Sequence, residues 1–194
     1  GELLVTAPVS TTEIHRQPGG YWRERRPHDI EPALNYAGTI DLYRRAKGMS
    51  AAGPPSPDAM GRLLAGLARG HAPDLEPRMI LDMGCGTGEE TLAYKREWPE
   101  AEVMGIDVAR PFIRFAHANA ESAGLALSFA EMDAAAVDLP DASVDLIVSI
   151  ILFHETTAAR VRTILRECRR LLRPGGLAIH LDVPYQPHRT PLVK

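Results

Sequence analysis

Three glycines stand close together in Gly84-Cys85-Gly86-Thr87-Gly88, directly after the apolar stretch 79–82. Between a strand and a helix such glycines let the backbone turn sharply and approach a ligand closely, because no Cβ stands in the way. Their G-x-G-x-G spacing differs from the G-x-G-x-x-G of a dinucleotide fingerprint, and the acids Glu89 and Glu90 follow at once. Two carboxylates at a helix N-terminus would repel a pyrophosphate, so the pattern favours a ligand without phosphate.

Acidic residues follow the predicted strands at three places. Asp82 precedes the glycines, Asp107 ends the apolar run 103–107, and Asp133 follows the run 125–130. A carboxylate at a strand tip can accept hydrogen bonds from both hydroxyls of a ribose, which a neutral residue would imitate poorly. Folds that bind NAD use the same device, so Asp107 by itself does not identify the cofactor.

These residues need a scaffold of alternating strands and helices. Five short apolar runs without strict polar alternation predict strands buried on both faces, as in a parallel sheet. The helix between the last two runs is the clearest, because apolar residues recur at helical spacing over 157–172. The order of elements predicts an α/β fold with a Rossmann-like, doubly wound, mostly parallel sheet. The predicted strands are 79–82, 103–107, 125–130, 144–152 and 177–182.

The chain divides into an irregular, proline-rich extension over residues 1–55 and a domain over residues 56–194. One helix is predicted in the extension, at 33–47. Ser56 and Pro57 are typical of a helix start and predict a second helix that ends near Gly70. Its predicted buried face consists of Met60, Leu63, Leu64 and Leu67. Aromatic and basic residues of the extension could form a lid over a ligand or simply pack on the sheet: His15, Arg16, Tyr21, Trp22, His28, Tyr36 and Tyr43.

The whole pattern resembles the class I S-adenosylmethionine-dependent methyltransferases, and within them the small-molecule branch that includes ubiquinone and menaquinone C-methyltransferases. The resemblance covers roughly residues 78–182, and it includes the segment 139–149 and the turn Arg173-Pro174-Gly175-Gly176. It implies S-adenosylmethionine as cofactor and S-adenosylhomocysteine as product. It also implies that a methyl group is transferred to an oxygen, nitrogen or carbon of a small-molecule acceptor.

The resemblance assigns roles to individual residues. Asp82 is expected to hold the amino group of the cofactor, the loop of Gly84 to Gly86 to wrap its methionine part, Asp107 to bind the ribose and Asp133 the adenine. The predicted cofactor-binding residues are Asp82, Gly84, Cys85, Gly86, Asp107, Val108, Asp133, Ala134 and Ser149.

His154 is the candidate catalytic residue. It follows the strand 144–152, and acceptors enter open α/β sheets at the carboxyl ends of the strands. An imidazole suits proton removal at neutral pH. Alternatively, His154 packs or caps a helix. Glu155 could orient the imidazole, although sequence neighbours rarely face each other at a strand end, or it could begin the next helix.

Charge and cysteine content limit the other classes of function. The formal net charge of −3 argues against a nucleic-acid-binding surface, and the run of six arginines is expected to be the solvated face of a helix rather than a polyanion site. These are Arg160, Arg162, Arg166, Arg169, Arg170 and Arg173. Cys85 and Cys168 suggest no disulfide framework, which favours a cytoplasmic protein, and no metal-ligand spacing or membrane-spanning segment is found. Any oligomer, such as a homodimer, is left open.

The family pattern continues past strand 177–182 with a helix and a β-hairpin, whereas residues 182–194 are broken by prolines. We therefore expect the C-terminal hairpin to be missing, strand 177–182 to be an open edge, and the sequence to be a fragment of a longer chain. Such a fragment could bind S-adenosylmethionine without transferase activity. The same residues leave open a protein or RNA methyltransferase and an NAD-dependent oxidoreductase.

Overall fold

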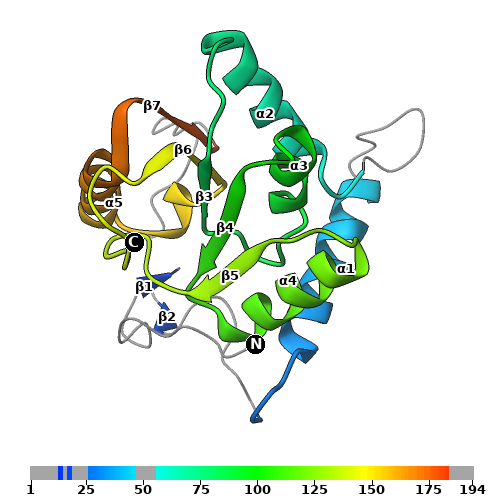
Figure 1. Cartoon of the computed structure of the whole chain (residues 1–194). Coiled ribbons are helices and arrows are strands. Elements are labelled where there is room, and N and C mark those ends of the chain that lie inside the picture. Colours follow the sequence, from blue (N-terminus) through cyan, green and yellow to red (C-terminus); the bar gives the residue numbers. More distant parts are fainter. Residues whose placement is uncertain (1–12, 15–16, 19–25, 47–55, 184–194) are drawn as a thin grey trace.

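The computed structural model describes residues 13–14, 17–18, 26–46 and 56–183. Its centre is a five-stranded, all-parallel sheet with the order β5-β4-β3-β6-β7 (Figure 1). The strands are β3 Met79–Met83, β4 Glu102–Asp107, β5 Ser128–Glu131, β6 Val144–Ile150 and β7 Leu172–Leu181. The order reverses beside β3, because β4 and β5 lie on one side of it and β6 and β7 on the other. The predicted Rossmann-like fold is confirmed, and ligands of such sheets bind at this reversal.

Helices cover both faces of the sheet (Figure 1). Helices α2 and α3 pack on one face of the sheet, where they share a core cluster with Ile80. Helix α5 packs on the opposite face, where it shares a core cluster with Leu81. This double burial explains why the strands are continuously apolar. The helices are α2 Ala59–His71, α3 Thr91–Glu97, α4 Arg110–Ser122 and α5 Ala158–Leu171.

The N-terminal extension contacts the domain through its helix. Its helix α1, Glu31–Ala46, contacts α4, and the rings of Tyr36 and Phe112 lie 4.9 Å apart between their centroids. A short antiparallel pair, β1 Glu13–Ile14 and β2 Gln17–Pro18, precedes it. Of the predicted lid, Tyr36 contacts α4, whereas His15, Arg16, Tyr21, Trp22 and the side chain of Tyr43 lie outside the described residues.

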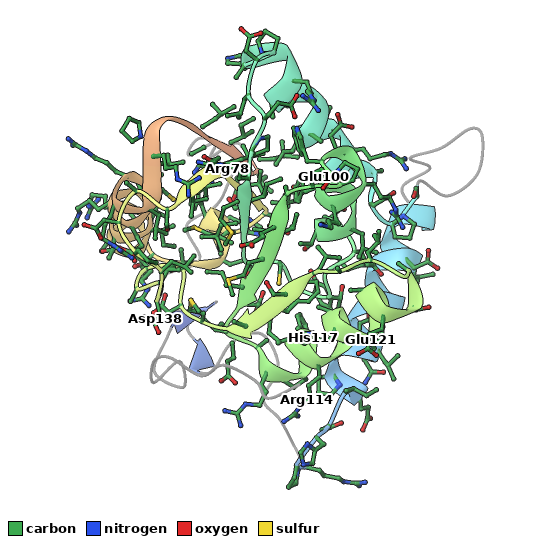
Figure 2. The ribbon with its side chains drawn as sticks, viewed as in Figure 1. Arg78, Glu100, Arg114, His117, Glu121 and Asp138 are labelled. Atoms are coloured by element: carbon green, nitrogen blue, oxygen red, sulfur yellow. The ribbon has the colours of Figure 1, made fainter. Side chains whose placement is uncertain are left out.

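The exposed residues include charged side chains as well as large apolar ones such as Leu42 and Leu34. Figure 2 labels the charged side chains of Arg78, Glu100 and Asp138, and all three are exposed. Within the described ranges, no helix is both long and apolar enough to cross a membrane. Strand β7 lies at the edge of the described sheet, as predicted.

Several predicted bounds were wrong by a few residues. Strand β5 begins at Ser128 rather than residue 125, and β6 ends at Ile150, where a short 3-10 turn, Phe153–Glu155, follows before α5. The predicted turn into the last strand lies inside β7: Leu172 already pairs with Val144, pairing resumes at Leu177, and Gly175 between them has φ +82°.

Helix α2 differs most from its prediction. It begins at Ala59 with Asp58 before it, and the Ser56 hydroxyl donates to the Asp58 carboxylate rather than capping the helix. The buried residues are Gly61, Leu64, Ala65 and Ala68, while Leu63 and Leu67 are 48% and 46% exposed. The reason is a close approach to α3, which only small residues permit. A Cβ on Gly61 would lie 2.3 Å from the backbone oxygen of Glu90.

We therefore expect Gly61→Ala and Gly66→Ala, two changes in the same helix, to have opposite effects. Gly61→Ala should lower stability by about 1–3 kcal/mol because the added methyl overpacks the contact with α3. Gly66 is exposed and has nothing within 4 Å of its Cβ position, so Gly66→Ala should add roughly 0.5–1 kcal/mol. Urea unfolding of both variants measures the two effects. A Gly61→Ala variant as stable as Gly66→Ala would contradict the described helix packing.

Candidate functional site

The glycine loop is fixed against the neighbouring strand. The backbone N–H groups of Gly84 and Cys85 both donate to the Ile106 carbonyl, at 2.8 and 3.0 Å. Gly84 has φ +73°, and a Cβ there would lie 2.9 Å from a methyl carbon of Leu152. The loop therefore requires glycine at this position, both for backbone conformation and for space.

Two cavities adjoin at this loop, because Gly84 lines both. The larger has a volume of about 410 Å³ and lies between the loop, α1 and the ends of β6 and β7. The smaller, about 50 Å³, lies between the ends of β4 and β5 and the start of α5. The larger is lined by Asp82, Gly84, Cys85, Gly86, Thr87, Glu89, Glu90, His154 and residues of α1 including Tyr36. The smaller is lined by Asp107, Val108, Asp133, Ala134, Leu152, Glu155 and Arg160, among others. Eight of the nine predicted cofactor-binding residues thus line these two cavities.

The larger cavity has an acidic wall. Asp82, Glu89 and Glu90 line it, and no lysine or arginine does so within the part of the chain that the structure describes. Such a wall favours a cationic ligand over a phosphate, because like charges at this range are costly. It agrees with the sequence argument against a pyrophosphate.

Asp82 lies at the base of this wall. It is only 2% exposed, and the Thr91 hydroxyl donates to its carboxylate at 2.7 Å. Burial raises the pKa of Asp82 to about 7, the Thr91 hydrogen bond opposes this rise, and the nearby charge of Asp107 adds to it. The side chain can therefore change its charge near neutral pH and is available to a cationic group.

Asp107 ends β4, as predicted, and its two oxygens point to different segments. One accepts the Gly86 N–H at 3.0 Å, and the other accepts the Ala109 N–H at 2.8 Å. Burial raises the pKa of this carboxyl, and these N–H donors oppose the rise. The side chain thus joins the glycine loop to the start of α4. A carboxylate offers about four acceptor positions, so it can accept from a ligand hydroxyl in addition to these N–H groups.

Asp133 lines the smaller cavity with Ala134, but it already has partners. Its carboxylate accepts from the Arg160 guanidinium and, at 2.8 Å, from the Ala135 N–H. The Arg160 contact was not predicted, since the arginines of α5 were expected to face solvent. Arg160 joins the cavity wall instead, because it lies in the first turn of α5, which faces the end of β5.

Ser149 is placed differently from the other eight. It lies 1% exposed within β6, and its hydroxyl is 2.8 Å from Nδ1 of His180, its pairing partner on β7. Ser149 is not one of the described residues that line the two cavities. Its role in ligand binding stays a prediction.

His154 lines the larger cavity from the 3-10 turn after β6. Its Nδ1 is 2.8 Å from the Asp182 carboxylate, and its Nε2 is 2.9 Å from the Glu155 carboxylate. Of the two roles considered for Glu155, the contact with Nε2 fits the orientation of the imidazole, and Glu155 lies in the 3-10 turn before α5 rather than in that helix. Asp182 was missed; the pairing of β7 with β6 places it here, 28 residues further along the chain.

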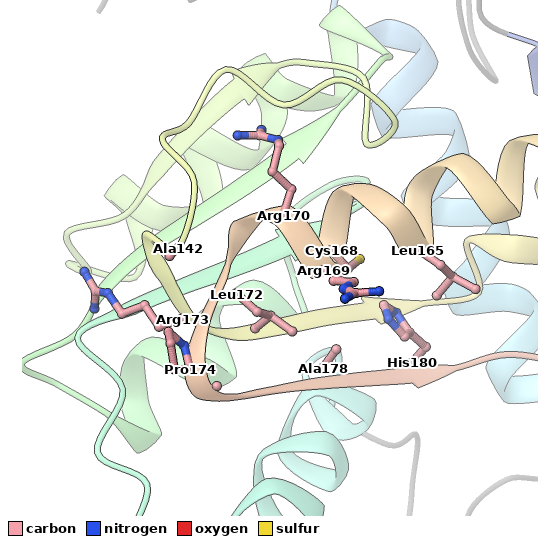
Figure 3. Close-up of a pocket in the computed structure, with 11 residues that line it drawn as sticks. Ala142, Leu165, Cys168, Arg169, Arg170, Leu172, Arg173, Pro174, Ala178 and His180 are labelled. Carbon is pink, nitrogen blue, oxygen red and sulfur yellow. The ribbon is translucent and has the colours of Figure 1, made fainter.

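The other arginines of the basic run are partly structural. Arg173 bonds both oxygens of Asp145 at 2.7 and 2.8 Å, and Arg170 contacts Glu167, Asp141 and two backbone carbonyls. Arg162, Arg166 and Arg169 are exposed, as predicted for a solvated face. Figure 3 shows Arg169 and Leu165 of α5 beside His180 of β7, along an open groove of about 640 Å³ that shares no residue with the two cavities.

Neither cysteine offers a reactive thiol. Cys85 and Cys168 are both buried and free, and burial raises the pKa of each thiol. Across residues 26–42 and 56–183, no three His, Cys, Asp or Glu side chains are grouped so that they could hold a metal ion.

Comparison with known proteins identifies relatives of this architecture. A family model described as a methyltransferase domain matches residues 80–176. The chain is 38% identical over 141 residues to a demethylmenaquinone methyltransferase of Thermus thermophilus, an alignment covering 69% of this chain and 63% of the relative. It is 37% identical over 107 residues to a malonyl-[acyl-carrier protein] O-methyltransferase of Xylella fastidiosa, covering 55% and 35% of the two chains. A crystal structure of a putative S-adenosyl-L-methionine-dependent methyltransferase from Methanococcus maripaludis has the same fold, with a TM-score of 0.62 at 20% identity over 83% of this chain and 67% of that one.

Proposed function

Because the chain belongs to the methyltransferase-domain family, we propose that it transfers the methyl group of S-adenosylmethionine to a small-molecule acceptor. The observation that carries this proposal is the pair of adjoining cavities at the glycine loop, with Asp82 on one side of Gly84 and Asp107 on the other. The chain spans 63% of the length of its demethylmenaquinone methyltransferase relative, so the activity is proposed for the protein to which this chain belongs.

The residues present fit this cofactor. The cationic amino and sulfonium groups suit the acidic wall that includes Asp82, and the methionine part suits the loop of Gly84, Cys85 and Gly86. Asp107 would accept from the ribose hydroxyls, with Val108 beside it. Asp133 and Ala134 would contact the adenine. These roles are those that the sequence predicts, and the placement of the residues around two joined cavities supports them.

When bound, this cofactor supplies a methyl group activated by a sulfonium. The protein has to hold the acceptor in line with that group and, where the acceptor carries a proton, remove it. We propose His154 as the base, since it lines the larger cavity at the carboxyl end of β6. Asp82 and Asp107 would hold the cofactor that supplies the methyl group, and the imidazole of His154 would accept the proton that the acceptor loses.

The acceptor is proposed to be small and partly apolar. Ile40, Met60, Ile150 and Val183 line the larger cavity beside its acidic wall. The names of the relatives include a demethylmenaquinone and a malonyl-[acyl-carrier protein] enzyme, which supports an organic acceptor with an oxygen or carbon nucleophile. The proposal also includes a nitrogen nucleophile, and the test below covers all three.

The cytoplasmic location and the homodimer remain proposals as well. The free state of Cys85 and Cys168 is compatible with a reducing compartment. Sedimentation of the purified chain would establish its oligomeric state.

The cofactor and the reaction need separate experiments. Calorimetry should show binding of S-adenosylhomocysteine and no binding of NAD; the reverse result would establish an NAD-dependent oxidoreductase instead. Incubation of the full-length protein with methyl-labelled S-adenosylmethionine and fractions of a cell extract should then label a small molecule. Binding without any labelled product would favour a binding module, and label in protein or RNA would favour a macromolecular acceptor.

We expect Asp107→Ala to weaken S-adenosylhomocysteine binding by more than ~1 kcal/mol, because the ribose hydroxyls lose a charged acceptor. Asp133→Ala should cost less, since water can partly satisfy an adenine amino group and the Asp133 carboxylate is already shared with Arg160. Calorimetry on both variants, with circular dichroism to confirm folding, tests the order. If folded Asp107→Ala bound S-adenosylhomocysteine as tightly as the parent chain, the ribose would not bind at the end of β4.

A further inference from the structure

The carboxylate of Asp182 joins the end of β7 to the turn that carries His154. One oxygen accepts the Phe153 N–H at 2.6 Å, while the other accepts the Val183 N–H at 2.7 Å and lies 2.8 Å from Nδ1 of His154. Only 16% of this side chain is exposed. With these contacts the carboxylate sets both the backbone of the turn and the orientation of the imidazole.

The hydrogen bonds also determine which ring nitrogen carries a proton. A carboxylate can only accept, so the contact with Asp182 requires a proton on Nδ1 of His154. The contact of Nε2 with Glu155 requires a proton on that nitrogen in turn. While both carboxylates are ionised, the two contacts require the doubly protonated ring; a lone pair forms at Nε2 only when Glu155 is displaced and the Nε2 proton passes to water.

The two partners are not equivalent. Asp182 is held in place by two backbone N–H groups in addition to the imidazole. Glu155 lines the smaller cavity while His154 lines the larger one, so the bond between Nε2 and Glu155 lies where the two cavities meet. A ligand that spans both cavities would meet this bond rather than the one to Asp182.

We propose that Asp182 is the positioning residue of the site: it keeps the proton on Nδ1 of His154, so that Nε2 is the nitrogen that gives up its proton to water when Glu155 is displaced and can then accept a proton from the methyl acceptor. The inference rests on the proposed function of His154. The carboxylate acts through the imidazole and touches neither cofactor nor acceptor.

Two matched variants separate the partners by nuclear magnetic resonance of the imidazole nitrogens, without any ligand. The His154 signals of the ¹⁵N-labelled chain are identified by their loss in His154→Gln. In Glu155→Ala, the neutral ring should carry its proton on Nδ1, because Asp182 remains. In Asp182→Ala, it should carry its proton on Nε2, because Glu155 remains. The same tautomer in both variants would overturn the proposal.

Further variants guard against a purely structural effect. Asp182→Asn can still accept the Phe153 N–H while its amide donates to Nδ1, so it should give the Nε2–H tautomer with the turn intact. Asp182→Glu retains the carboxylate and should restore the Nδ1–H tautomer. Asp145→Asn is the control, since Asp145 also accepts two backbone N–H groups but lies far from His154 in the sheet register; it should leave the tautomer unchanged. A changed tautomer in this control would show that the signal reports stability and would sink the proposal.

Turnover provides the second readout, with the acceptor found in the labelling experiment. Asp182→Asn should lower kcat about 10²-fold or more with KM for the acceptor nearly unchanged, and Asp182→Glu should recover most of it. Equal kcat in Asp182→Asn and the parent enzyme would overturn the positioning role. If the parent chain did not bind S-adenosylhomocysteine, the proposed function would be refuted. The tautomer measurement would not be affected, because it uses no ligand.

Discussion

Replacement of His154 by alanine is expected to lower turnover about 10²–10⁴-fold while leaving affinity for S-adenosylhomocysteine almost unchanged. The imidazole is the proposed proton acceptor, whereas the residues proposed to hold the cofactor are the glycine loop and the acids at the strand ends. The loss should shrink as the pH rises, because an acceptor that ionises unaided no longer needs a base. Single-turnover rates against pH, with the labelled cofactor, measure the effect.

A packing role for His154 would give a different result. The ring is 32% exposed and bonds Asp182, so its loss could destabilise the turn after β6. The melting temperature of His154→Ala would then fall while the rate per folded molecule stayed near that of the parent. If the ratio of the parent rate to the His154→Ala rate did not change with pH while the melting temperature fell, His154 would not be a base. His154→Gln is a useful companion, since it retains a donor toward Asp182 without a titrating group.

The sheet, and the position of eight of the nine candidate cofactor-binding residues beside the two cavities, could be predicted because their signals are local in the chain. A continuous apolar run predicts a strand buried on both faces, and the residue at its end lies at the binding edge whatever the tertiary detail. Asp107 illustrates this, since it ends β4 and lines the smaller cavity as its place in the sequence implies. The glycine loop is similar, because its spacing depends on its own backbone.

Other features depend on strand register and on side-chain size, and these are not local. Ser149 lies within the apolar run of β6, and its partner His180 is set by the pairing of β6 with β7. The bond between Asp182 and His154 follows from the same pairing. Leu63 and Leu67 fit a helical stripe, yet α2 turns its small residues inward because α3 approaches closely at Gly61. Helical periodicity identifies two possible faces there and cannot choose between them.

The second large effect concerns Asp82, whose replacement by asparagine is expected to stabilise the ligand-free chain and to weaken cofactor binding. Burial raises the pKa of Asp82 to about 7, whereas an unfolded aspartate titrates near ~3.9. Between these two values the folded chain holds a proton that the unfolded chain has lost. The free energy of unfolding of the parent therefore falls as the pH rises from about 4 to about 7, and it stays low above that window.

Asp82→Asn removes this ionisation but can still accept from the Thr91 hydroxyl. Its free energy of unfolding should exceed that of the parent by on the order of 2–4 kcal/mol at pH 8, and the difference should vanish toward pH 4. Asp145→Asn is the control of opposite sign. Burial alone would raise the pKa of Asp145, but Arg173 and two backbone N–H groups hold it below its usual value. That variant should be less stable than the parent at pH 8, and its deficit should shrink only in acid.

Affinity should change in the opposite direction to stability at Asp82. The cationic amino group of the cofactor favours the ionised carboxylate, so the parent should bind S-adenosylhomocysteine more tightly as the pH rises through about 7, whereas Asp82→Asn should bind weakly throughout. Urea unfolding and calorimetry over the same pH series give both curves. If Asp82→Asn gained stability but kept the affinity of the parent at pH 8, the carboxylate would be a strained buried acid with no part in binding. If Asp82→Asn were less stable than the parent at pH 8, the fold would stabilise the ionised carboxylate. Burial would then not raise the pKa of Asp82, and the prediction would be wrong.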